Sequence, residues 1–391
     1  MKPHVAIFVP PAHGHINPTL ALSKELVSRG YRVTYAVSER FAPAVREVGA
    51  DYVSHEVSGS QEGFTSWEEV AERWSDQGAL DLRRSLATHE HFRKDRPDVI
   101  LFDGATVSGV VMARNSPDIP SISLSPSFAH NEQFPFSMGG WEVTDNWVER
   151  TIIQPIDEAL PEENIGSYLV NHVHAVNLVF IPKFFQYHPD TFDHRFFFVG
   201  PSLSERAFYG RWSPPREAGK IVLISLGTVM NAQVDYFRAC MDALRHLDIY
   251  VVMTVGAGTD IAKLGEIPRN CEVHSFISHL DILPHAAAFI GHGGMNSTME
   301  SLYYGVPMLL VPQDGHQRLI AQRVAELGLG TRLTEPTNFA ESLLTLLNDK
   351  QKISRVTAVG AEMRKTNGAR VAADVVERIY HQRRNTPITT A

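Results

Sequence analysis

The sequence predicts an α/β protein of two domains, each built around a doubly wound parallel sheet. The chain has 391 residues, whereas a single hydrophobic core stops growing near about 250–300 residues. Short β-rich runs that are apolar on both faces alternate with stretches of helical periodicity, which is the pattern of parallel strands covered by helices. This alternation begins again in the second half of the chain. We therefore expect two similar domains with a site in the cleft between them.

The first domain is predicted over residues 1–201. Its buried strands are expected at 4–10, 31–37, 98–104 and 120–126. Residues 18–30 lie between the first two strands and carry apolar side chains at helical spacing. Asn17 suits the N-cap of this helix, Pro18 its first position and Gly30 its end. A strand–helix–strand unit crosses over in the right-handed sense, which gives a doubly wound sheet.

The second domain is predicted over residues 221–368, after a linker at 202–220 that is rich in Ser, Pro, Gly and charge. Its strands are expected at 221–228, 249–256, 288–294 and 307–313. Residues 321–330 are expected to form a helix that ends in glycine. The last segment, 369–391, is predicted as an amphipathic helix and tail, and it is a candidate for packing back on the first domain.

Composition and charge exclude several classes of protein. The chain has 36 Lys and Arg against 44 Asp and Glu, a net charge of −8, and no basic block, so nucleic acid is not expected as a partner. Two cysteines, Cys240 and Cys271, argue against a disulfide scaffold and suit a reducing cytosol. No apolar run approaches the about 18 residues of a membrane span, and the first residues lack a signal peptide. We expect a soluble cytoplasmic protein.

Residues 291–301, GHGGMNSTMES, lead from a predicted strand through two glycines into a predicted helix. The N–H groups and dipole at a helix N-terminus favour a phosphate. Gly293 and Gly294 let the backbone approach a ligand because no Cβ stands in the way. Asn296 and Ser297 are placed either to cap the helix or to donate to phosphate oxygens. The stretch therefore predicts a phosphate site.

Two further side chains bear on this phosphate interpretation. Glu300 lies four residues after Asn296, hence on the same helix face, where a carboxylate can accept both hydroxyls of a ribose. The alternative is a helix whose N-terminus is capped for stability alone. His292 weakens that alternative, because a histidine at a strand end facing a glycine turn gains nothing structural.

At these residues the chain resembles the family 1 glycosyltransferases, the UDP-glycosyltransferases. Residues 276–317 are similar to their nucleotide-sugar signature, and the segments GHINP (14–18) and SLGT (225–228) stand in the family's order and spacing. The whole chain most resembles the bacterial macrolide branch. The resemblance implies a GT-B fold, in which two Rossmann-like domains face each other across a cleft. It also implies inverting transfer of a sugar from a UDP-sugar, with no metal and no cofactor.

The resemblance, carried over position by position, surrounds the donor with residues of the second domain. Those implied at the pyrophosphate are Thr228, His292, Gly294, Asn296 and Ser297. Those implied at the uridine are Phe276 against uracil, Ile277 through its backbone, and His279 and Glu300 near the ribose. His279 stands where relatives commonly carry glutamine. Phe276 stands where many carry tryptophan, and its aromatic face keeps the stacking role.

The sugar end of the predicted site departs from the family. Gln317 is implied at the sugar hydroxyls, and relatives usually carry an acidic residue directly before it. Here that residue is His316, with Asp314 two positions earlier. A neutral imidazole offers one acceptor and one donor, whereas a carboxylate accepts from two hydroxyls. We therefore expect UDP-glucose as donor, with weak discrimination against other UDP-hexoses unless Asp314 replaces the carboxylate.

His15 and Asp103 are predicted as the catalytic pair. An acceptor hydroxyl must lose its proton as it attacks, and a histidine that titrates near neutrality suits this task. His13 and His15 both follow the first strand, where doubly wound sheets bind ligands; the resemblance implies His15 as the base. Asp103 ends strand 98–104 and would orient the base, although it could simply cap the next helix. His13 and His15 lack a nearby third ligand, so no metal is predicted.

The acceptor is expected to be an apolar small molecule with a hydroxyl, such as a macrolide, a flavonoid or another phenol or alcohol. Aromatic and large apolar residues in irregular segments of the first domain are the predicted pocket, unless half or more of them are ordinary core. They are Trp67, Trp74, Phe134, Phe136, Met138, Trp141 and Trp147. Ser127 matches a family serine near the donor phosphate or sugar, and a neighbouring family serine is here Pro126.

Other functions stay open at this point. One is a different GT-B enzyme on UDP-sugars, such as a UDP-GlcNAc epimerase; another is a non-catalytic activator related to the glycosyltransferases. The presence of His15 argues against the second. A dinucleotide site at Gly256 and Gly258 is disfavoured, because the third glycine position holds Ile261. The sequence leaves the natural acceptor, the attachment position and the oligomeric state undetermined.

Overall fold

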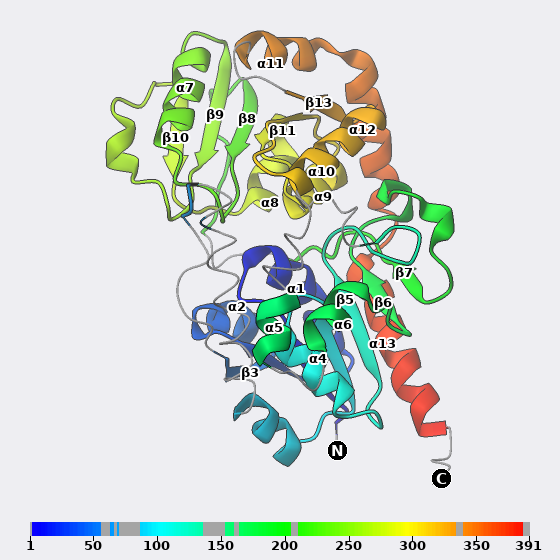
Figure 1. Cartoon of the computed structure of the whole chain (residues 1–391). Helices are drawn as coiled ribbons and strands as arrows, with labels where there is room; N and C mark the ends of the chain where they lie inside the picture. The colour runs from blue at the N-terminus through cyan, green and yellow to red at the C-terminus, as the bar shows by residue number, and fades with distance from the viewer. Residues whose placement is uncertain are drawn as a thin grey trace.

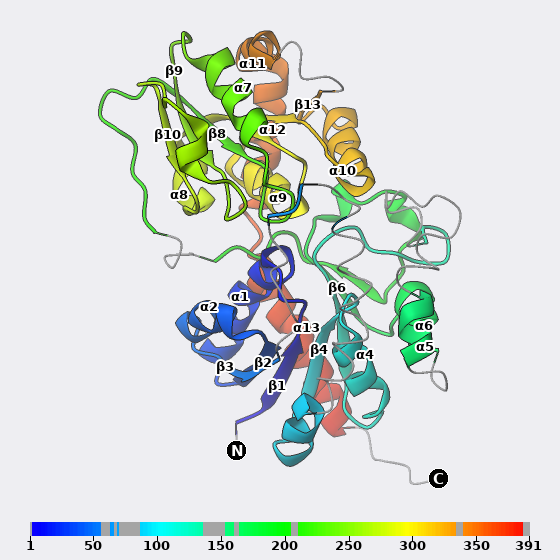
Figure 2. The ribbon, with the colours of Figure 1, turned by 60° about the vertical axis from the view of Figure 1, so that its left-hand side comes forward.

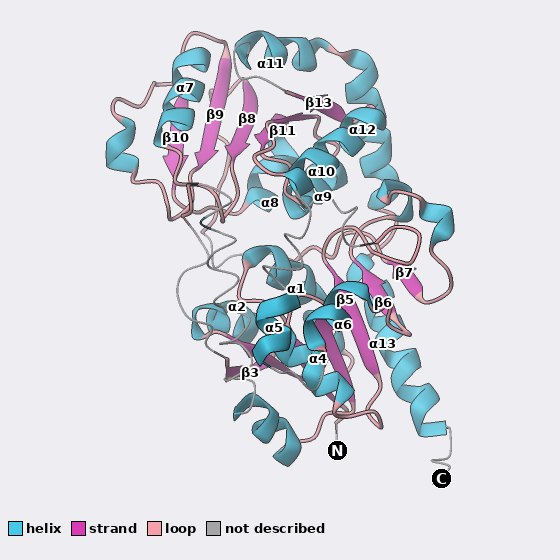
Figure 3. Cartoon of the chain, viewed as in Figure 1, coloured by secondary structure: helices cyan, strands magenta, loops and turns pink. Residues whose placement is uncertain are grey.

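The structure is a computed structural model, and it describes residues 2–55, 63–65, 69, 87–135, 153–159, 164–204, 210–333 and 339–385. Within these residues the chain forms two α/β halves, one above the other (Figure 1). Each half contains one parallel sheet (Figure 3). The turned view shows helices on both faces of each sheet (Figure 2). The predicted α/β architecture with two parallel sheets is therefore confirmed.

The sheet of the first half has the order β3-β2-β1-β4-β5-β6-β7. Its strands are β1 (His4–Phe8), β2 (Arg32–Val37), β3 (Asp51–Ser54), β4 (Val99–Asp103), β5 (Ser121–Ser125), β6 (Asn177–Val179) and β7 (Phe196–Phe198). All neighbouring pairs are parallel. The central strands β1 and β4 are buried along their whole length, which agrees with their apolar residues on both faces.

Helices cover both faces of this first sheet. They are α1 (His13–Ser28), α2 (Ala42–Glu47), a helix over 87–94, α4 (Val107–Arg114), α5 (Gln154–Ala159) and α6 (Ile165–Asn171). Short 3-10 turns are η1 (Glu39–Phe41), η4 (Lys183–Phe185) and η5 (Pro189–Thr191). The carboxyl ends of β1 and β4 point toward the second half, which places the loops after these strands at the interface (Figure 2).

The sheet of the second half has the order β10-β9-β8-β11-β12-β13, again with all pairs parallel. Its strands are β8 (Lys220–Ser225), β9 (Ile249–Thr254), β10 (Cys271–His274), β11 (Ala286–Gly291), β12 (Met308–Leu310) and β13 (Gly330–Arg332). Its helices are α7 (Val234–Leu244), α8 (His279–Ile282), α9 (Met295–Tyr304), α10 (Gly315–Glu326), α11 (Phe339–Asn348) and α12 (Lys350–Met363), with 3-10 turns η7 (Ile261–Leu264) and η8 (Leu283–His285).

The last helix, α13 (Gly368–Asn385), leaves the second half and packs along the first (Figures 1 and 2). Its apolar residues, Ala372, Ala373, Val375, Val376 and Tyr380, belong to the same core cluster as Leu26 and Tyr31. At the surface of this contact, Arg29 of the α1 end lies 2.7 Å from Asp374 and 3.0 Å from Glu377. The helix therefore ties the two halves together through an apolar stripe with charged edges.

Several predicted element boundaries are wrong by two or more residues, and three of them bear on the site. Helix α1 begins at His13, so Asn17 and Pro18 lie inside it rather than at its start. Strand β8 ends at Ser225, because Gly227 adopts φ +77 and turns the chain. Helix α10 begins at Gly315 instead of residue 321, because the Asp314 side chain caps it by accepting a hydrogen bond from the Gln317 N–H.

Candidate active site

A cavity of about 590 Å³ lies between the two halves. Its walls come from the loops after β1, β4 and β5 on one side, and from the loops after β8 and β11 with the starts of α9 and α10 on the other. The predicted residues that line it are His15, Asp103, Ser127, Thr228, Phe276, Ile277, His279, His292, Gly294, Asn296, Ser297, Glu300, His316 and Gln317. Residues predicted from separate motifs thus meet in one space.

His15 and Asp103 form a hydrogen-bonded pair on the first-half wall. Strands β1 and β4 are neighbours in register, with Phe8 opposite Phe102, so the residues that follow them meet at one sheet edge. His15 Nδ1 lies 2.8 Å from Asp103 Oδ2. Because a carboxylate only accepts, Nδ1 carries the proton and Nε2 is left as the basic nitrogen.

The environment of this pair favours a charged imidazole. Burial opposes the charged form of His15, but the charge of Asp103 and the hydrogen bond to it outweigh burial, so the pKa of His15 is raised above 6.5. The Asp103 carboxylate is itself only 3% exposed. Its Oδ1 accepts a hydrogen bond of 2.9 Å from the Ala105 N–H, so the same carboxylate also holds the turn before α4. Asp103 therefore makes both contacts that were expected of it: one with the predicted base and one with the backbone before the next helix.

The opposite wall carries the glycine turn between β11 and α9. Gly293 adopts φ +89, and a Cβ there would lie 3.0 Å from the Gln317 carbonyl oxygen. The His292 ring is packed between two glycines: a Cβ on Gly227 would come within 2.6 Å of it, and one on Gly294 within 2.5 Å. Burial, with a smaller opposing effect from the Ser225 backbone, lowers the pKa of His292 to about 4. His292 is therefore a neutral donor at pH 7.

The uridine end of the predicted site has a ring at its rim and a carboxylate inside. Phe276 is 36% exposed at the cavity, and its ring centroid lies 6.2 Å from that of His13. His279 Nε2 lies 2.8 Å from Thr254 Oγ1, so this histidine is held in place from β9. Glu300 is 2% exposed on the inner face of α9. An aromatic platform and a buried acceptor are the groups that a base and a ribose would require.

At the sugar end, His316 reaches across the cavity to the first half. Its Nε2 lies 2.7 Å from Ser127 Oγ, and its ring meets Phe128 edge-on at 6.2 Å between centroids. Burial, and then the nearby His15 and His292, lower the pKa of His316 to about 4. The imidazole is therefore neutral at pH 7, and one of its two nitrogens is already engaged by Ser127.

Asp314 and Gln317 both line the cavity and hydrogen-bond to each other. Asp314 Oδ1 accepts from the Gln317 backbone N–H at 2.7 Å, and its Oδ2 accepts from Gln317 Nε2 at 2.6 Å. Gln317 Oε1 in turn accepts from the Gln313 N–H at 2.8 Å. Burial raises the pKa of Asp314 to about 6. Asp314 thus caps α10 through Oδ1, and its Oδ2 accepts from the Gln317 side chain.

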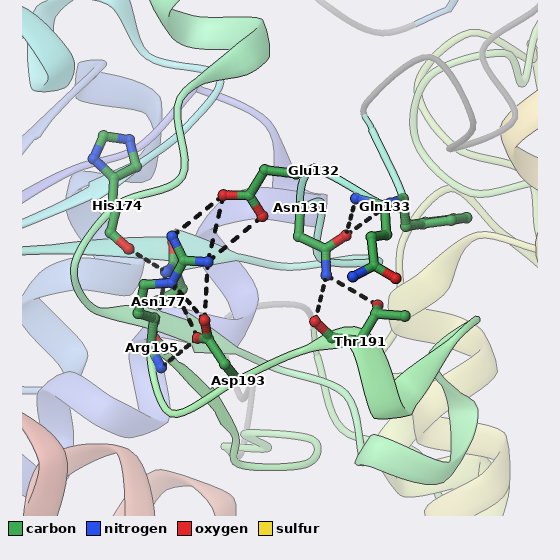
Figure 4. A network of polar contacts seen from close by, with 9 residues as sticks. Asn131, Glu132, Gln133, His174, Asn177, Thr191, Asp193 and Arg195 are labelled. Atoms are coloured by element: carbon green, nitrogen blue, oxygen red, sulfur yellow. Dashed lines mark hydrogen bonds and ion pairs between the residues drawn. The ribbon is translucent and has the colours of Figure 1, made fainter.

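Phe134 does not line the cavity, contrary to the prediction for the acceptor pocket. Its side chain is 2% exposed and stacks on His130, with ring centroids 5.9 Å apart. The reason lies in Asn131, whose Oδ1 accepts from the N–H groups of Gln133 and Phe134 and turns the chain inward (Figure 4). The other predicted pocket residues lie outside the described residues: Trp67, Trp74, Phe136, Met138, Trp141 and Trp147.

Part of the cavity wall in the first half consists of residues that the sequence analysis did not select. They are Ile156, Leu169, Val170, His172, Val173, His174 and Phe196. The Tyr168 and His172 rings stack at 4.1 Å, and burial, with a smaller effect of His172, lowers the pKa of His174 to about 4. The wall is therefore apolar with neutral imidazoles. Only the two histidines of the segment HVHAV could have drawn notice, and no motif surrounds them.

A polar network behind this wall fixes its backbone (Figure 4). Asn177 Nδ2 donates to the carbonyl oxygens of His174 at 2.7 Å and Arg195 at 3.3 Å. The Arg195 guanidinium in turn contacts Asp193 at 2.9 Å and Glu132 at 3.4 Å. These contacts join the loops on either side of β6, so the position of His174 is set by neighbouring strands.

The described residues contain neither a candidate metal site nor a candidate membrane span. Across the part of the chain that the structure describes, no three His, Cys, Asp or Glu side chains are grouped so that they could hold a metal ion. Within the same residues, no helix combines the length and the apolar composition that crossing a membrane requires.

Comparisons with known proteins agree with this geometry. Residues 238–380 match the family model described as the C-terminal domain of erythromycin biosynthesis protein CIII-like proteins. The NDP-glycosyltransferase YjiC of Bacillus licheniformis is 37% identical over 96% of this chain and 97% of its own length. The demethyllactenocin mycarosyltransferase of Streptomyces fradiae is 34% identical, over 96% of this chain and 86% of its own length.

Solved structures give the same class. The glycosyltransferase of kitacinnamycin superposes with a TM-score of 0.80 at 31% identity, over 97% of this chain and 99% of that one. The calicheamicin glycosyltransferase CalG4 superposes with a TM-score of 0.78 at 29% identity, over 99% of this chain and all of that one. The fold is GT-B, as predicted. The chain belongs to the family 1 glycosyltransferases, in the branch of the bacterial macrolide and NDP-glycosyltransferases, and is an enzyme of the UDP-glycosyltransferase class.

Proposed function

We propose that this enzyme transfers a hexose, glucose above others, from a UDP-sugar to a hydroxyl of an apolar small molecule. One observation carries the proposal: the His15–Asp103 pair and the glycine turn before α9 face each other across a single cavity. A base on one wall and an anion site on the other are what an in-line sugar transfer requires. Relatives that act on natural products, such as the demethyllactenocin mycarosyltransferase, support a natural product as the acceptor.

His15 acts as the general base in this proposal. The acceptor hydroxyl gives its proton to Nε2 while its oxygen forms a bond to the anomeric carbon. The bond from that carbon to the phosphate oxygen breaks, and the electron pair leaves with UDP. Because the base and the phosphate site lie on opposite walls, attack comes from the side opposite the leaving group, and the anomeric centre inverts. Asp103 stabilises the imidazolium that forms.

Fixed donors stabilise the departing UDP in place of a metal. The α9 N-terminus, neutral His292 and the turn that carries Thr228 converge on the same end of the cavity. We therefore propose that turnover needs no divalent cation.

The test is UDP release from UDP-glucose, measured with a panel of macrolide and phenolic acceptors and repeated with EDTA. Acceptor-dependent release that survives EDTA is the expected result. Conversion of UDP-GlcNAc without any acceptor would indicate an epimerase instead. Release that depends strongly on Mg²⁺ would overturn the helix-based account of the leaving group.

A further inference from the structure

Helix α1 contains a proline that removes a hydrogen bond beside the predicted base. In an α-helix each N–H donates to the carbonyl four residues earlier. Pro18 lies in the interior of α1, has no N–H, and so cannot donate to the carbonyl of Gly14. That carbonyl belongs to the peptide bond that joins Gly14 to His15, so the gap falls in the turn that carries the base.

The missing donor comes from the other half of the molecule. Asn296 Nδ2 lies 3.0 Å from the Gly14 carbonyl oxygen, although the two residues are 282 positions apart. Asn296 is the second residue of α9, the helix whose N-terminus is the predicted phosphate site. A primary amide has two N–H donors, so one can hold Gly14 while the other remains for a phosphate oxygen.

His15 is therefore restrained at two points. Its side chain is held by Asp103 at 2.8 Å, a contact within the first half. Its backbone is held through the Gly14 carbonyl by Asn296, a contact between the halves. The second restraint exists only while α9 and α1 are together, and residues of both helices line the cavity.

We propose that Asn296 is a positioning residue for the general base: it replaces the helical hydrogen bond that Pro18 removes and so ties the placement of His15 to the closed pairing of the two halves. The proposal rests on the proposed function, in which His15 is the base. It assigns to Asn296 an effect on kcat that is separate from any contact with the donor phosphates.

The experiment compares Asn296→Ala in two backgrounds, the native chain and Pro18→Ala. In the native background we expect kcat to fall about tenfold, equivalent to about 1.4 kcal/mol. The Kd of UDP is measured separately by calorimetry, so that an effect on donor binding is not counted as an effect on kcat. In the Pro18→Ala background the new N–H of residue 18 can donate to Gly14, so we expect the same substitution to cost less than about threefold. Ser297→Ala is the matched control: it alters the same helix turn without touching Gly14, and its loss should be equal in both backgrounds.

The same variants are compared by NMR, which requires no turnover. The amide nitrogen of His15 shares its peptide group with the Gly14 carbonyl, so its signal should move in Asn296→Ala and return in the double variant. Thermal unfolding checks that each variant is folded. An equal loss of kcat in both backgrounds, a loss confined to the Kd of UDP, or an unmoved His15 signal would each overturn the proposal. A different result would refute the proposed function instead. In that case the wild type glycosylates no acceptor, although the His15 signal moves in Asn296→Ala and returns in the double variant.

Discussion

Asp103→Asn is the substitution that tests the catalytic pair most directly. Asp103 uses Oδ1 to accept from the Ala105 N–H at 2.9 Å and Oδ2 to face His15 Nδ1 at 2.8 Å. In the variant, the Ala105 N–H still needs an acceptor, so the amide oxygen keeps that place and the NH₂ group turns toward His15. The NH₂ group then donates to Nδ1, which leaves the imidazole proton on Nε2, the atom that has to accept the acceptor's proton.

The expected loss follows from charge as well as from this tautomer. Two unit charges about 4 Å apart attract by about 4 kcal/mol at an effective dielectric constant of about 20. The imidazolium that forms in the transition state loses that attraction when the carboxylate becomes an amide. Since each 1.36 kcal/mol corresponds to about tenfold in rate, we expect kcat to fall by about 10³-fold, within the range of general base catalysis.

The assay is UDP release with an acceptor that the wild type glycosylates, together with calorimetry for UDP, whose Kd should not change. Asp98→Asn is a control of the same chemical type just before the opposite end of β4, where Asp98 accepts from the His4 N–H at 2.8 Å. An asparagine can also accept that bond, so this variant should keep the wild-type kcat. If Asp103→Asn retains more than about a tenth of the wild-type kcat, against a general-base contribution of about 10²–10⁴, the assignment of the pair is wrong.

Three further predictions concern the donor, the sugar and pH. Glu300→Ala should weaken UDP and UDP-glucose alike by about 5- to 150-fold, because ribose hydroxyls would lose a buried acceptor worth about 1–3 kcal/mol; unchanged calorimetric affinity would place the ribose elsewhere. His316→Asp should raise the ratio of kcat/KM for UDP-glucose over UDP-galactose, because neutral His316 already spends one nitrogen on Ser127. A wild type that prefers glucose by about 10³ or more, equivalent to about 4 kcal/mol, with no gain from aspartate, would contradict it. The pH profile of kcat/KM for the acceptor tests the base, because only neutral His15 accepts a proton and Asp103 raises the pKa of His15 above 6.5. Activity should therefore be lost as the pH falls through a pKa above 6.5. A loss of activity that begins only below pH 6.5 would argue against this base.

Local pattern was enough to predict the two parallel sheets, eight of their strands and the glycine turn, but not the short strands β3, β6, β7, β10 and β13. Strands buried on both faces show their apolar residues in the sequence, and parallel strands end at one edge of a sheet. This placed His15 and Asp103 at the same sheet edge, and the family resemblance selected these two residues as a pair. Gly293 was predictable for a similar reason: its φ of +89 and the space that a Cβ would fill are requirements on one residue.

Contacts between residues far apart in the chain were decided by the tertiary structure. The sequence alone places a helix start at Pro18, because the cost of an interior proline is local. The Asn296 amide that donates to the Gly14 carbonyl instead lies 282 residues from Gly14. The partner of His316 is likewise Ser127 of the other half, and no spacing rule connects them. Periodicity shows which side chains are apolar but not which apolar side chains face a cavity. Phe134 is therefore buried in the core, whereas His174 and its neighbours line the cavity.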